Sequence, residues 1–344
     1  MINVSVIIPV HNVPIVYLKE CFASLSAQAM EECEFIIVLD GSPEQVWFVC
    51  EAFSQKDRRF RLFRRTHAGV SASRNFGLQQ AQGTYIAFVD ADDVVDSSYL
   101  SEMYTKAVLW KSEIIATNHN VIINGQKKDF QAKWNNKNVP IISSLLKEQI
   151  LEDFILLKEN SIPRGPWGKL FLRNFLTEHN LFFNTKLEIG EDLVFNLNAF
   201  SKAKTISFLN KKFYFYRKNN ESATRRFRQD FFQTIQKTAI EIINIYGGKF
   251  NPFLWRFVLG YFYQSWENCY MHPKNPADYR TRMKQITAII KSNFFQYICS
   301  ISNYTEMPII NKIELFLFKR KITFFIWFHG AKAELINHRK KTHC

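Results

Sequence analysis

The sequence predicts an α/β domain with a doubly wound, mostly parallel sheet and flanking helices, followed by a mainly helical region. Short apolar runs alternate with segments of helical periodicity between residues 4 and 93. Two of the runs end at acidic turns, and ligands of doubly wound sheets bind beyond the carboxyl ends of the strands. From about Phe227 the pattern is mainly helical and rich in Phe, Tyr and Trp.

The first predicted elements alternate between strand and helix. The run Val4–Val10 is almost continuously apolar, which is typical of a strand buried on both faces. A helix with apolar residues at helical spacing follows at Leu18–Ala29, and then a second strand at Phe35–Leu39. In the turn Asp40-Gly41-Ser42-Pro43, Ser42 is expected to cap the next helix, with Pro43 in its first position. Three further elements are expected at Phe60–Phe63 (strand), Val70–Ala81 (helix) and Tyr85–Val89 (strand).

Beyond residue 95 the alternation loosens. A hairpin is expected from Glu113–Thr117 and Val121–Ile123, with Asn124-Gly125 as its turn, before a polar loop at Gln126–Pro140. Helical patterns occur near Ser98–Trp110, Leu145–Leu157, Leu170–His179 and Glu191–Phe200, and paired strands near Ile206–Leu209 and Phe213–Tyr216. We place a boundary near residue 225, between a domain of residues 1–225 and a helical region of residues 226–344.

The composition is that of an ordinary globular protein with an excess of positive charge. With 344 residues, 47% of them hydrophobic and 22% charged, the chain is long enough for two domains and is not a disordered or collagenous chain. The 45 Lys and Arg residues exceed the 31 Asp and Glu residues, which gives a net charge of +14. A polyanion, a phosphorylated ligand or an anionic membrane surface is therefore an expected partner.

Cysteine spacing and hydropathy predict a cytoplasmic location. The six cysteines show no Cys-x-x-Cys spacing and are expected to be reduced thiols. Met1–Asn12 lacks a basic region before its apolar run, so no signal peptide is expected. No uncharged apolar stretch approaches the roughly 18 to 20 residues that span a bilayer.

The segment Asp90-Ala91-Asp92-Asp93 places three carboxylates in four residues at the end of a predicted strand. Their repulsion is costly unless a cation or hydrogen-bond donors offset it. Mg²⁺ and Mn²⁺ prefer one or two carboxylates together with substrate oxygens, so a divalent cation bound with phosphates is one interpretation. A solvated turn in which Asp93 caps the following helix is the other.

Four more segments carry groups that could bind a ligand, and each has an ordinary structural interpretation. Asp40 could accept a hydrogen bond from a base or ribose, or belong to a simple turn. The small residues before Arg74 could admit a nucleotide close to the backbone, or form a tightly packed helix with a surface arginine. Glu191 and Asp192 stand where a helix begins, a position that favours acids without any catalytic role. The basic segment Lys211–Arg228 could screen a diphosphate or be solvated.

Taken together and in order, these segments resemble the family 2 glycosyltransferases, the inverting GT-A family that includes many bacterial capsule and lipopolysaccharide enzymes. The resemblance covers roughly residues 4 to 225 and implies a GT-A fold. It is carried by the opening strand through His11-Asn12, the turn Leu39–Ser42, the Gly69–Gly77 segment, the Asp-x-Asp motif at Asp90–Asp93, Trp167-Gly168-Lys169, Glu191-Asp192, and Tyr214–Arg217 with Ser222.

The resemblance implies a role for each matched segment. The donor is a UDP-sugar bound in residues 1–95 by Pro9, Val10, His11, Asn12, Asp40, Arg74, Asp90, Ala91 and Asp92. Asp40 and Arg74 would hold the uracil, whereas Asp92, with Asp90, would ligate Mn²⁺ or Mg²⁺ between the phosphates.

The remaining roles fall on the acceptor side, at about residues 96–225. Asp192 would take the proton of the acceptor hydroxyl in an in-line, inverting attack. Glu191 and Trp167 are candidates for contact with the acceptor or sugar, although a buried core position is equally open for Trp167. Arg217 and Ser222 are diphosphate-side candidates.

Three departures from the family pattern limit the resemblance. The second-strand turn often carries two acids, and here Leu39 precedes Asp40. No Gln-x-x-Arg-Trp segment is present, so the processive membrane-spanning synthases match poorly. No histidine after Asp192 is assigned as a metal ligand.

The end of the chain interleaves basic and aromatic residues. Eight Lys and Arg residues from Lys312 to Lys341 oppose only Glu314 and Glu334, among six Phe and Trp residues. This pattern is typical of a helix at the surface of an anionic membrane, and equally of a final helix that packs on the domain with a basic tail.

We therefore expect a metal-dependent hexosyltransferase. It would transfer a hexose or N-acetylhexosamine to a glycan or lipid-linked oligosaccharide in surface polysaccharide synthesis, in the cytoplasm or at the inner face of the membrane. The alternative is a non-catalytic UDP-sugar-binding or scaffold protein of the same fold. Nucleic acid is not an expected partner, because no reader motif accompanies the basic residues.

Overall fold

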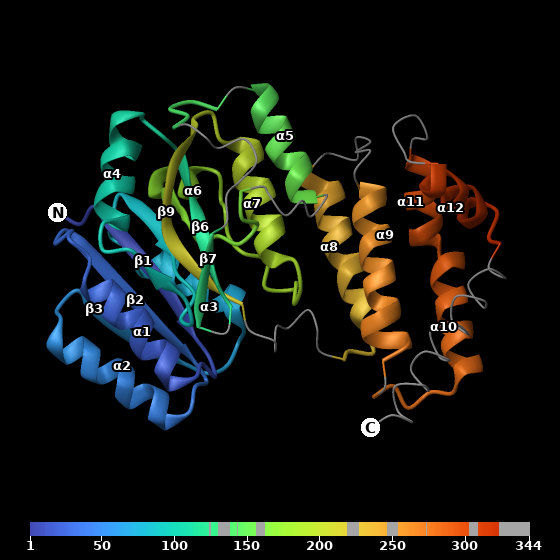
Figure 1. The fold of residues 1–344 in the computed structure, drawn as a ribbon, viewed down its shortest axis with the longest axis horizontal. Coiled ribbons are helices and arrows are strands. Elements are labelled where there is room, and N and C mark those ends of the chain that lie inside the picture. The colour runs from blue at the N-terminus through green and yellow to red at the C-terminus, as the bar shows by residue number, and fades with distance from the viewer. Residues whose placement is uncertain are drawn as a thin grey trace. The chain divides into compact units, whose positions relative to one another are not determined.

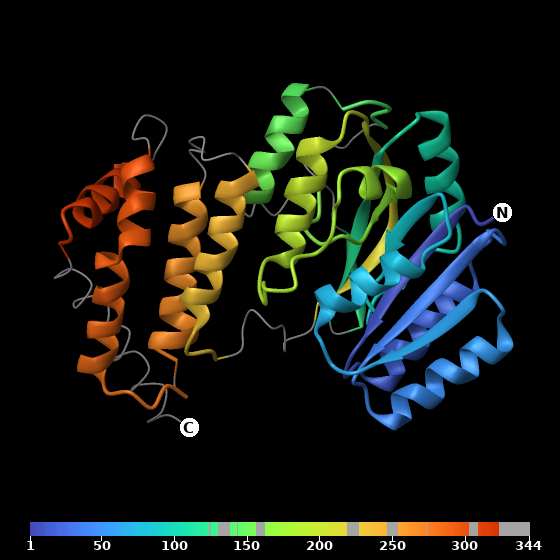
Figure 2. The same ribbon diagram turned by 180° about the vertical axis from the view of Figure 1, so that it is seen from behind.

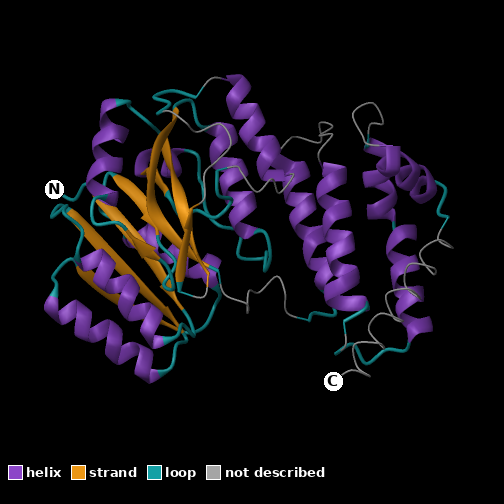
Figure 3. Ribbon diagram, in the orientation of Figure 1, coloured by secondary structure: helices purple, strands orange, loops and turns teal. Residues whose placement is uncertain are grey.

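In a computed structural model of the chain, the structure describes residues 1–123, 125–129, 138–142, 144–155, 162–218, 227–245, 254–272, 274–302 and 309–322. The chain divides into two units, Met1–Asn219 and Asn220–Cys344. The first contains a mixed sheet with flanking helices and the second is helical (Figures 1 and 3). The predicted fold class is confirmed, whereas the separate roles expected of residues 1–95, 96–225 and 226–344 stay predictions.

The first unit alternates strands and helices up to β4. Its strands are β1 (Val4–Val10), β2 (Cys33–Asp40), β3 (Phe60–Arg65), β4 (Tyr85–Phe88), β5 (Val94–Val95), β6 (Ile114–Ile123), β7 (Gln126–Asp129), β8 (Lys169–Leu172) and β9 (Ile206–Arg217). Its helices are α1 (Ile15–Ser26), α2 (Glu44–Lys56), α3 (Val70–Gln80), α4 (Tyr99–Leu109), α5 (Ser144–Ile155), α6 (Arg173–Glu178) and α7 (Glu191–Lys202).

The strands form one sheet in the order β3-β2-β1-β4-β8-β6-β9-β5, with β7 paired to β6. The first four strands are parallel, β8 is antiparallel to both of its neighbours, and β6 and β9 are parallel. Figures 1 and 2 together show α1 and α2 against one face of the first strands and α3 against the other. Strand order reverses at β1, so β1 and β4 flank the point where ligands of such sheets bind.

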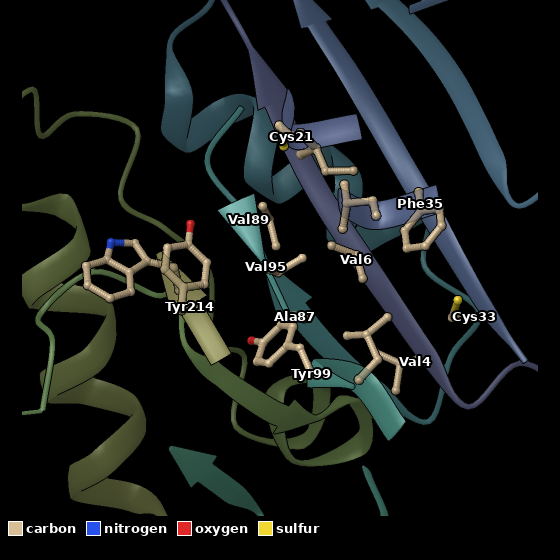
Figure 4. Packing of buried hydrophobic residues seen from close by; sticks show 14 of the residues in the cluster. Val4, Val6, Cys21, Cys33, Phe35, Ala87, Val89, Val95, Tyr99 and Tyr214 are labelled. Atoms are coloured by element: carbon tan, nitrogen blue, oxygen red, sulfur yellow. The ribbon is translucent and has the colours of Figure 1, made fainter. Parts of the chain in front are cut away.

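Strand β1 is buried on both faces, as its apolar run predicts. Val4 and Val6 belong to the same cluster of buried residues as Phe35 of β2 and Cys21 of α1, part of which Figure 4 shows. On the opposite face α3 approaches so closely that a Cβ at Gly77 would lie 2.4 Å from Ile7 Cγ2. Glycine at this position therefore lets α3 pack closely against the middle of β1.

The structure differs from the sequence-based elements at four places. Residues 169–172 form strand β8 in place of a helix, and only Arg173–Glu178 is helical. Strand β6 runs unbroken through the middle of the expected hairpin and pairs with β7, which occupies residues 126–129 at the start of the expected polar loop. Strand β9 replaces two paired strands. Ser42 does not cap α2, because its hydroxyl donates to Val10 O at 2.8 Å. Pro43 precedes that helix as the cap residue.

The second unit packs helices around a core of aromatic rings. Phe262, Phe295 and Phe318 contact one another with ring centroids 5.3 to 5.8 Å apart, and Trp255 contacts two of them. Its elements are α8 (Phe231–Ile245), α9 (Leu254–Ser265), a π-helical turn η2 (Trp266–Tyr270), α10 (Tyr279–Lys291), α11 (Asn293–Ile301) and α12 (Ile309–Lys319).

Two expectations from the sequence, on membrane-spanning helices and on cysteines, can be compared with the described residues. None of their helices reaches the length and apolarity that crossing a bilayer requires. Free and buried cysteines stand at positions 21, 33, 50, 269 and 299.

Candidate active site

The candidate site gathers at the carboxyl edge of β1, β2 and β4. Asp40 is the last residue of β2, and the acidic turn Asp90–Asp93 follows β4. Helix α3 begins beside this edge at Val70, and α7 begins at Glu191. The fold thereby brings residues from four separate segments of the sequence to one place.

Arg74, on the first turns of α3, is the cation at the centre of the site. Its side chain is 3% exposed, and its guanidinium contacts Asp192 Oδ1 at 2.5 Å and Asp90 Oδ1 at 2.9 Å. Glu191 Oε1 lies 3.9 Å away, and the ring of Phe183 lies 5.1 Å below the guanidinium carbon. The structural alternative of a surface arginine is therefore wrong. Contact of Arg74 with a uracil base stays a prediction.

The three acids around Arg74 shift one another's protonation. Burial, followed by the charge of Asp192, raises the pKa of Glu191 to about 8. Burial also raises the pKa of Asp192, although Arg74 opposes this shift. Burial lowers the pKa of Arg74, but the facing carboxylates outweigh it, so this pKa lies above its usual range. The pKa of the Glu191 carboxyl thus lies above neutral pH, whereas the charge of Arg74 favours the ionised form of Asp192.

The acidic turn divides into two partly exposed acids and one buried acid. Asp90 and Asp92 are partly exposed, whereas Asp93 is fully buried. Asp93 accepts hydrogen bonds from the Tyr214 hydroxyl at 2.7 Å and from the Arg217 amide at 2.6 Å, both on β9. Burial and the two neighbouring aspartates raise the pKa of Asp93 well above its usual range. Asp93 therefore joins the turn to β9, and it is Ser98 that stands at the start of α4.

Arg217 holds the same turn from the end of β9. Its Nε donates to Asp92 O at 2.8 Å, and its guanidinium pairs with Glu20 and stacks over Tyr17, with 4.1 Å to the ring centroid. The side chain is 9% exposed. This geometry places Arg217 next to the Asp-x-Asp segment, and its contact with a diphosphate stays a prediction. Ser222 lies outside the described residues.

The ends of β1 and β2 carry a second group of polar residues. The Asp40 carboxylate accepts hydrogen bonds from the Ala68 and Gly69 amides, each at 2.8 Å, and faces His67 Nδ1 at 2.8 Å. His11 Nδ1 lies 2.6 Å from Asp40 O, and the rings of His11 and His67 stack with centroids 4.3 Å apart.

These contacts tie the β2 turn to the segment before α3. Within the described residues, His11, Asp40 and His67 also form a group whose possible metal-ligand atoms all lie within 4.8 Å of one another. His67 was not predicted as a site residue, and the one available signal was its place two residues before Gly69, the residue that precedes α3. Pro9 and Val10 end β1, and Asn12 follows with a left-handed φ of 48°.

Trp167 is packed among aromatic side chains. Its ring stacks on Tyr214 and Tyr216 at centroid distances of 4.7 and 5.2 Å, and His119 meets it edge-on at 5.0 Å. Only 8% of the residue is exposed. The packing agrees with the core interpretation of Trp167, and its contact with a sugar stays a prediction.

The loop before β8 is tied to the site from both sides. The buried Lys169 ammonium donates to the carbonyls of Pro163 at 2.6 Å and Gly165 at 2.7 Å. Burial lowers the pKa of Lys169 to about 7. From α7, Asn196 Nδ2 donates to Arg164 O at 2.5 Å and to Asp192 O at 3.1 Å. The hydrogen bonds from Lys169 and Asn196 to this loop could not be predicted from the sequence, because they depend on where β8 lies in the sheet.

A doubly wound sheet with an Asp-x-Asp turn and an acidic helix start converging at its carboxyl edge agrees with the GT-A glycosyltransferase fold that the sequence resemblance implies. The sequence profile of the family described as Glycosyl transferase family 2 matches residues 5–179, just over half of the chain. The chain therefore belongs to glycosyltransferase family 2.

Named relatives and a solved structure agree with this assignment. The chain is 27% identical over 293 residues to the uncharacterized glycosyltransferase EpsJ of Bacillus subtilis. The aligned residues cover 82% of this chain and 83% of EpsJ. It is 27% identical over 251 residues to the poly(ribitol-phosphate) beta-N-acetylglucosaminyltransferase TarS of Staphylococcus aureus, covering 71% of this chain and 41% of TarS. The fold is similar to that of S. aureus TarS 1–349 in complex with UDP, with a TM-score of 0.67, 20% identity, and coverage of 98% and 92% of the two chains.

Proposed function

We propose that this family 2 glycosyltransferase moves a hexose or N-acetylhexosamine from a UDP-sugar to a hydroxyl of a glycan or lipid-linked oligosaccharide, with inversion, in bacterial surface polysaccharide synthesis. The observation that carries the proposal is the Arg74 bridge between Asp90 and Asp192, because it joins the acidic turn to the acidic helix start. The TarS structures in complex with UDP and with UDP-GlcNAc support a UDP-sugar donor.

Asp192 is the proposed general base. Its side chain is 28% exposed, so an acceptor hydroxyl can reach it, and Arg74 stabilises its ionised form. Glu191 is 15% exposed and has its pKa raised to about 8, so it serves as a hydrogen-bond donor toward the acceptor or sugar. When the surroundings of two neighbouring carboxyl groups give them different pKa values, one can act as an acid and the other as a base in the same reaction.

A divalent cation fits the two partly exposed carboxylates of the acidic turn. Hard cations such as Mg²⁺ and Mn²⁺ take carboxylate oxygens with substrate phosphates, and Asp90 and Asp92 would hold such an ion. When bound, the ion would neutralise charge that develops on the departing diphosphate.

The chain itself orients the turn that carries these two carboxylates. The Tyr214 hydroxyl accepts a hydrogen bond from the Asp90 amide at 3.1 Å, and Arg217 holds the Asp92 carbonyl at 2.8 Å. Both residues lie on β9, so the turn is fixed to the sheet.

The nucleotide is proposed to bind along the end of β1, at Pro9, Val10, His11 and Asn12, with Asp40 behind them. Asp40 is 2% exposed and its carboxylate already accepts two backbone amides. We therefore propose that Asp40 acts on the base mainly by shaping the turn that carries His67.

The test is UDP release by the purified full chain with a panel of UDP-sugars, with Mn²⁺ and with EDTA. We expect one donor to release UDP by slow hydrolysis, and EDTA to abolish the signal. The control is Asp92→Ala, which we expect to weaken UDP binding only when Mn²⁺ is present. UDP binding equal with and without Mn²⁺ would overturn the metal assignment. UDP binding with no release from any donor, even when extracted glycans and lipid-linked acceptors are added, would support the non-catalytic alternative.

A further inference from the structure

The positive charge of the chain is concentrated in the second unit. Residues 220–344 contain 19 Lys and Arg residues and 8 Asp and Glu residues, so they carry +11 of the net +14. The first 219 residues carry only +3. A nucleotide-sugar site in the first unit therefore does not explain the net positive charge of the second unit. An anionic partner of the second unit has to be sought among its own residues.

Helix α12 has an apolar face on each of two opposite sides. Leu315 and Phe318 are 0% and 1% exposed and face the aromatic core of the unit. Ile309, Ile313 and Phe316 are 75%, 55% and 48% exposed. The spacing of these three residues, four and then three positions apart, places them on one stripe of the helix, turned away from the buried pair.

Basic side chains border the exposed stripe. Lys312 and Lys319 lie on the helix beside it, and Arg320 and Lys321 follow its last turn. The Arg320 guanidinium lies over the Phe316 ring, 5.3 Å from the centroid, so an arginine lies directly beside the apolar surface. The acid of the helix, Glu314, accepts a hydrogen bond from the Tyr263 hydroxyl at 2.5 Å and lies on another side.

This arrangement matches the chemistry of an anionic bilayer surface. Isoleucine and phenylalanine on one stripe enter the boundary between headgroups and acyl chains, and lysine and arginine beside them remain with the phosphates. Each basic residue near an anionic surface adds to binding, and the effect extends only over a Debye length. A second copy of the chain would bring the same basic residues against one another, so charge complementarity favours lipid.

We propose that α12 docks on the surface of a membrane that contains anionic phospholipid, with Ile309, Ile313 and Phe316 inserted and the four basic residues at the headgroups. This docking does not depend on the transfer reaction. It therefore stands or falls separately from the proposed function.

The test is cosedimentation of the full chain with vesicles of phosphatidylcholine alone and of phosphatidylcholine with phosphatidylglycerol. We expect binding only to the anionic vesicles, with release at high salt. The double variant Ile313→Glu and Phe316→Glu should bind at least about tenfold more weakly. Phe48→Glu, which alters a 58% exposed residue of α2, is the matched control and should bind like the wild type. Because all three side chains are exposed, the urea unfolding midpoints should stay unchanged.

Two results would overturn the proposal. Equal binding of the double variant and the wild type to anionic vesicles would mean that α12 is not the contact. Absence of vesicle binding, with a wild-type dimer that the double variant dissociates in size-exclusion chromatography, would assign the stripe to self-association instead.

Discussion

Arg74 pairs with both Asp90 and Asp192 at the centre of the site. The substitution Arg74→Met tests how much these ion pairs stabilise the fold, because it removes the charge and keeps an apolar side chain. The variant leaves Asp90, Asp192 and Glu191 facing one another without a counter-charge. Removing one partner of a buried ion pair costs about 3–5 kcal/mol. The side chains of Asp90 and Asp192 are 27% and 28% exposed, so water screens part of the repulsion. We expect a loss of about 2–3 kcal/mol at pH 8.

The pH dependence of that loss is specific to the proposed cause. Burial raises the pKa values of Glu191 and Asp192 in the folded state, so without Arg74 these two acids take up protons as the pH falls, and the repulsion decreases. Urea unfolding should therefore show a smaller loss at pH 5 than at pH 8. Arg74→Lys keeps one charge but cannot contact two acids at once, and should lose about half as much. A loss below about 1 kcal/mol at pH 8, or an equal loss at both pH values, would refute the reasoning.

Three further substitutions have expected effects on urea unfolding. Because the folded-state pKa of Glu191 is about 8 and its usual value is 4.5, the wild type loses stability as the pH rises between these values, and Glu191→Gln should gain about 4 kcal/mol at pH 8 but only about 1 kcal/mol at pH 5. Tyr214→Phe removes one of the two hydrogen bonds to the buried Asp93 and leaves the Arg217 amide as its donor, so it should cost about 1–3 kcal/mol, whereas no change would remove this contact from the account. Gly83→Ala puts a Cβ 2.5 Å from a backbone nitrogen of β1 and should cost about 3 kcal/mol. Gly260→Ala, a helical glycine with open space around it, is its control and should be neutral or stabilising.

The elements that the sequence predicted well are those whose own residues decide their structure. Val4–Val10 was predicted with its observed bounds, because an apolar run between polar ends can only be a buried strand in this context. Helix α3, observed at Val70–Gln80, follows a left-handed Gly69 with φ of 90°, a conformation that glycine readily adopts.

The elements that were mispredicted depend on distant partners. Residues 169–172 pair with both β4 and β6, and these contacts override a local pattern that favoured helix. In β6 the polar residues around Asn118 indicated a break. The strand continues there through an irregular register with β9, where Asn118 Nδ2 donates to Asn210 Oδ1 at 2.7 Å.

The candidate site shows the same division. The acidic turn and the acidic helix start could be named from local motifs, as could Arg74. The contact between Arg74 and Asp192 spans 118 positions and follows only from the fold. Asp93 was grouped with its neighbours by spacing, yet burial beneath β9 separates it from Asp90 and Asp92.

The most direct test of the account is the rate of UDP release by Asp192→Asn, measured with the donor that the wild type consumes. General bases contribute about 10²–10⁴-fold to rate, so we expect a loss in that range. Donor affinity measured by calorimetry on the same sample should stay within about twofold of the wild type, because Asp90 still pairs with Arg74 when the Asp192 charge is removed. A wild-type rate of UDP release by Asp192→Asn would contradict the account, because the Asp192 carboxylate could then not be the general base.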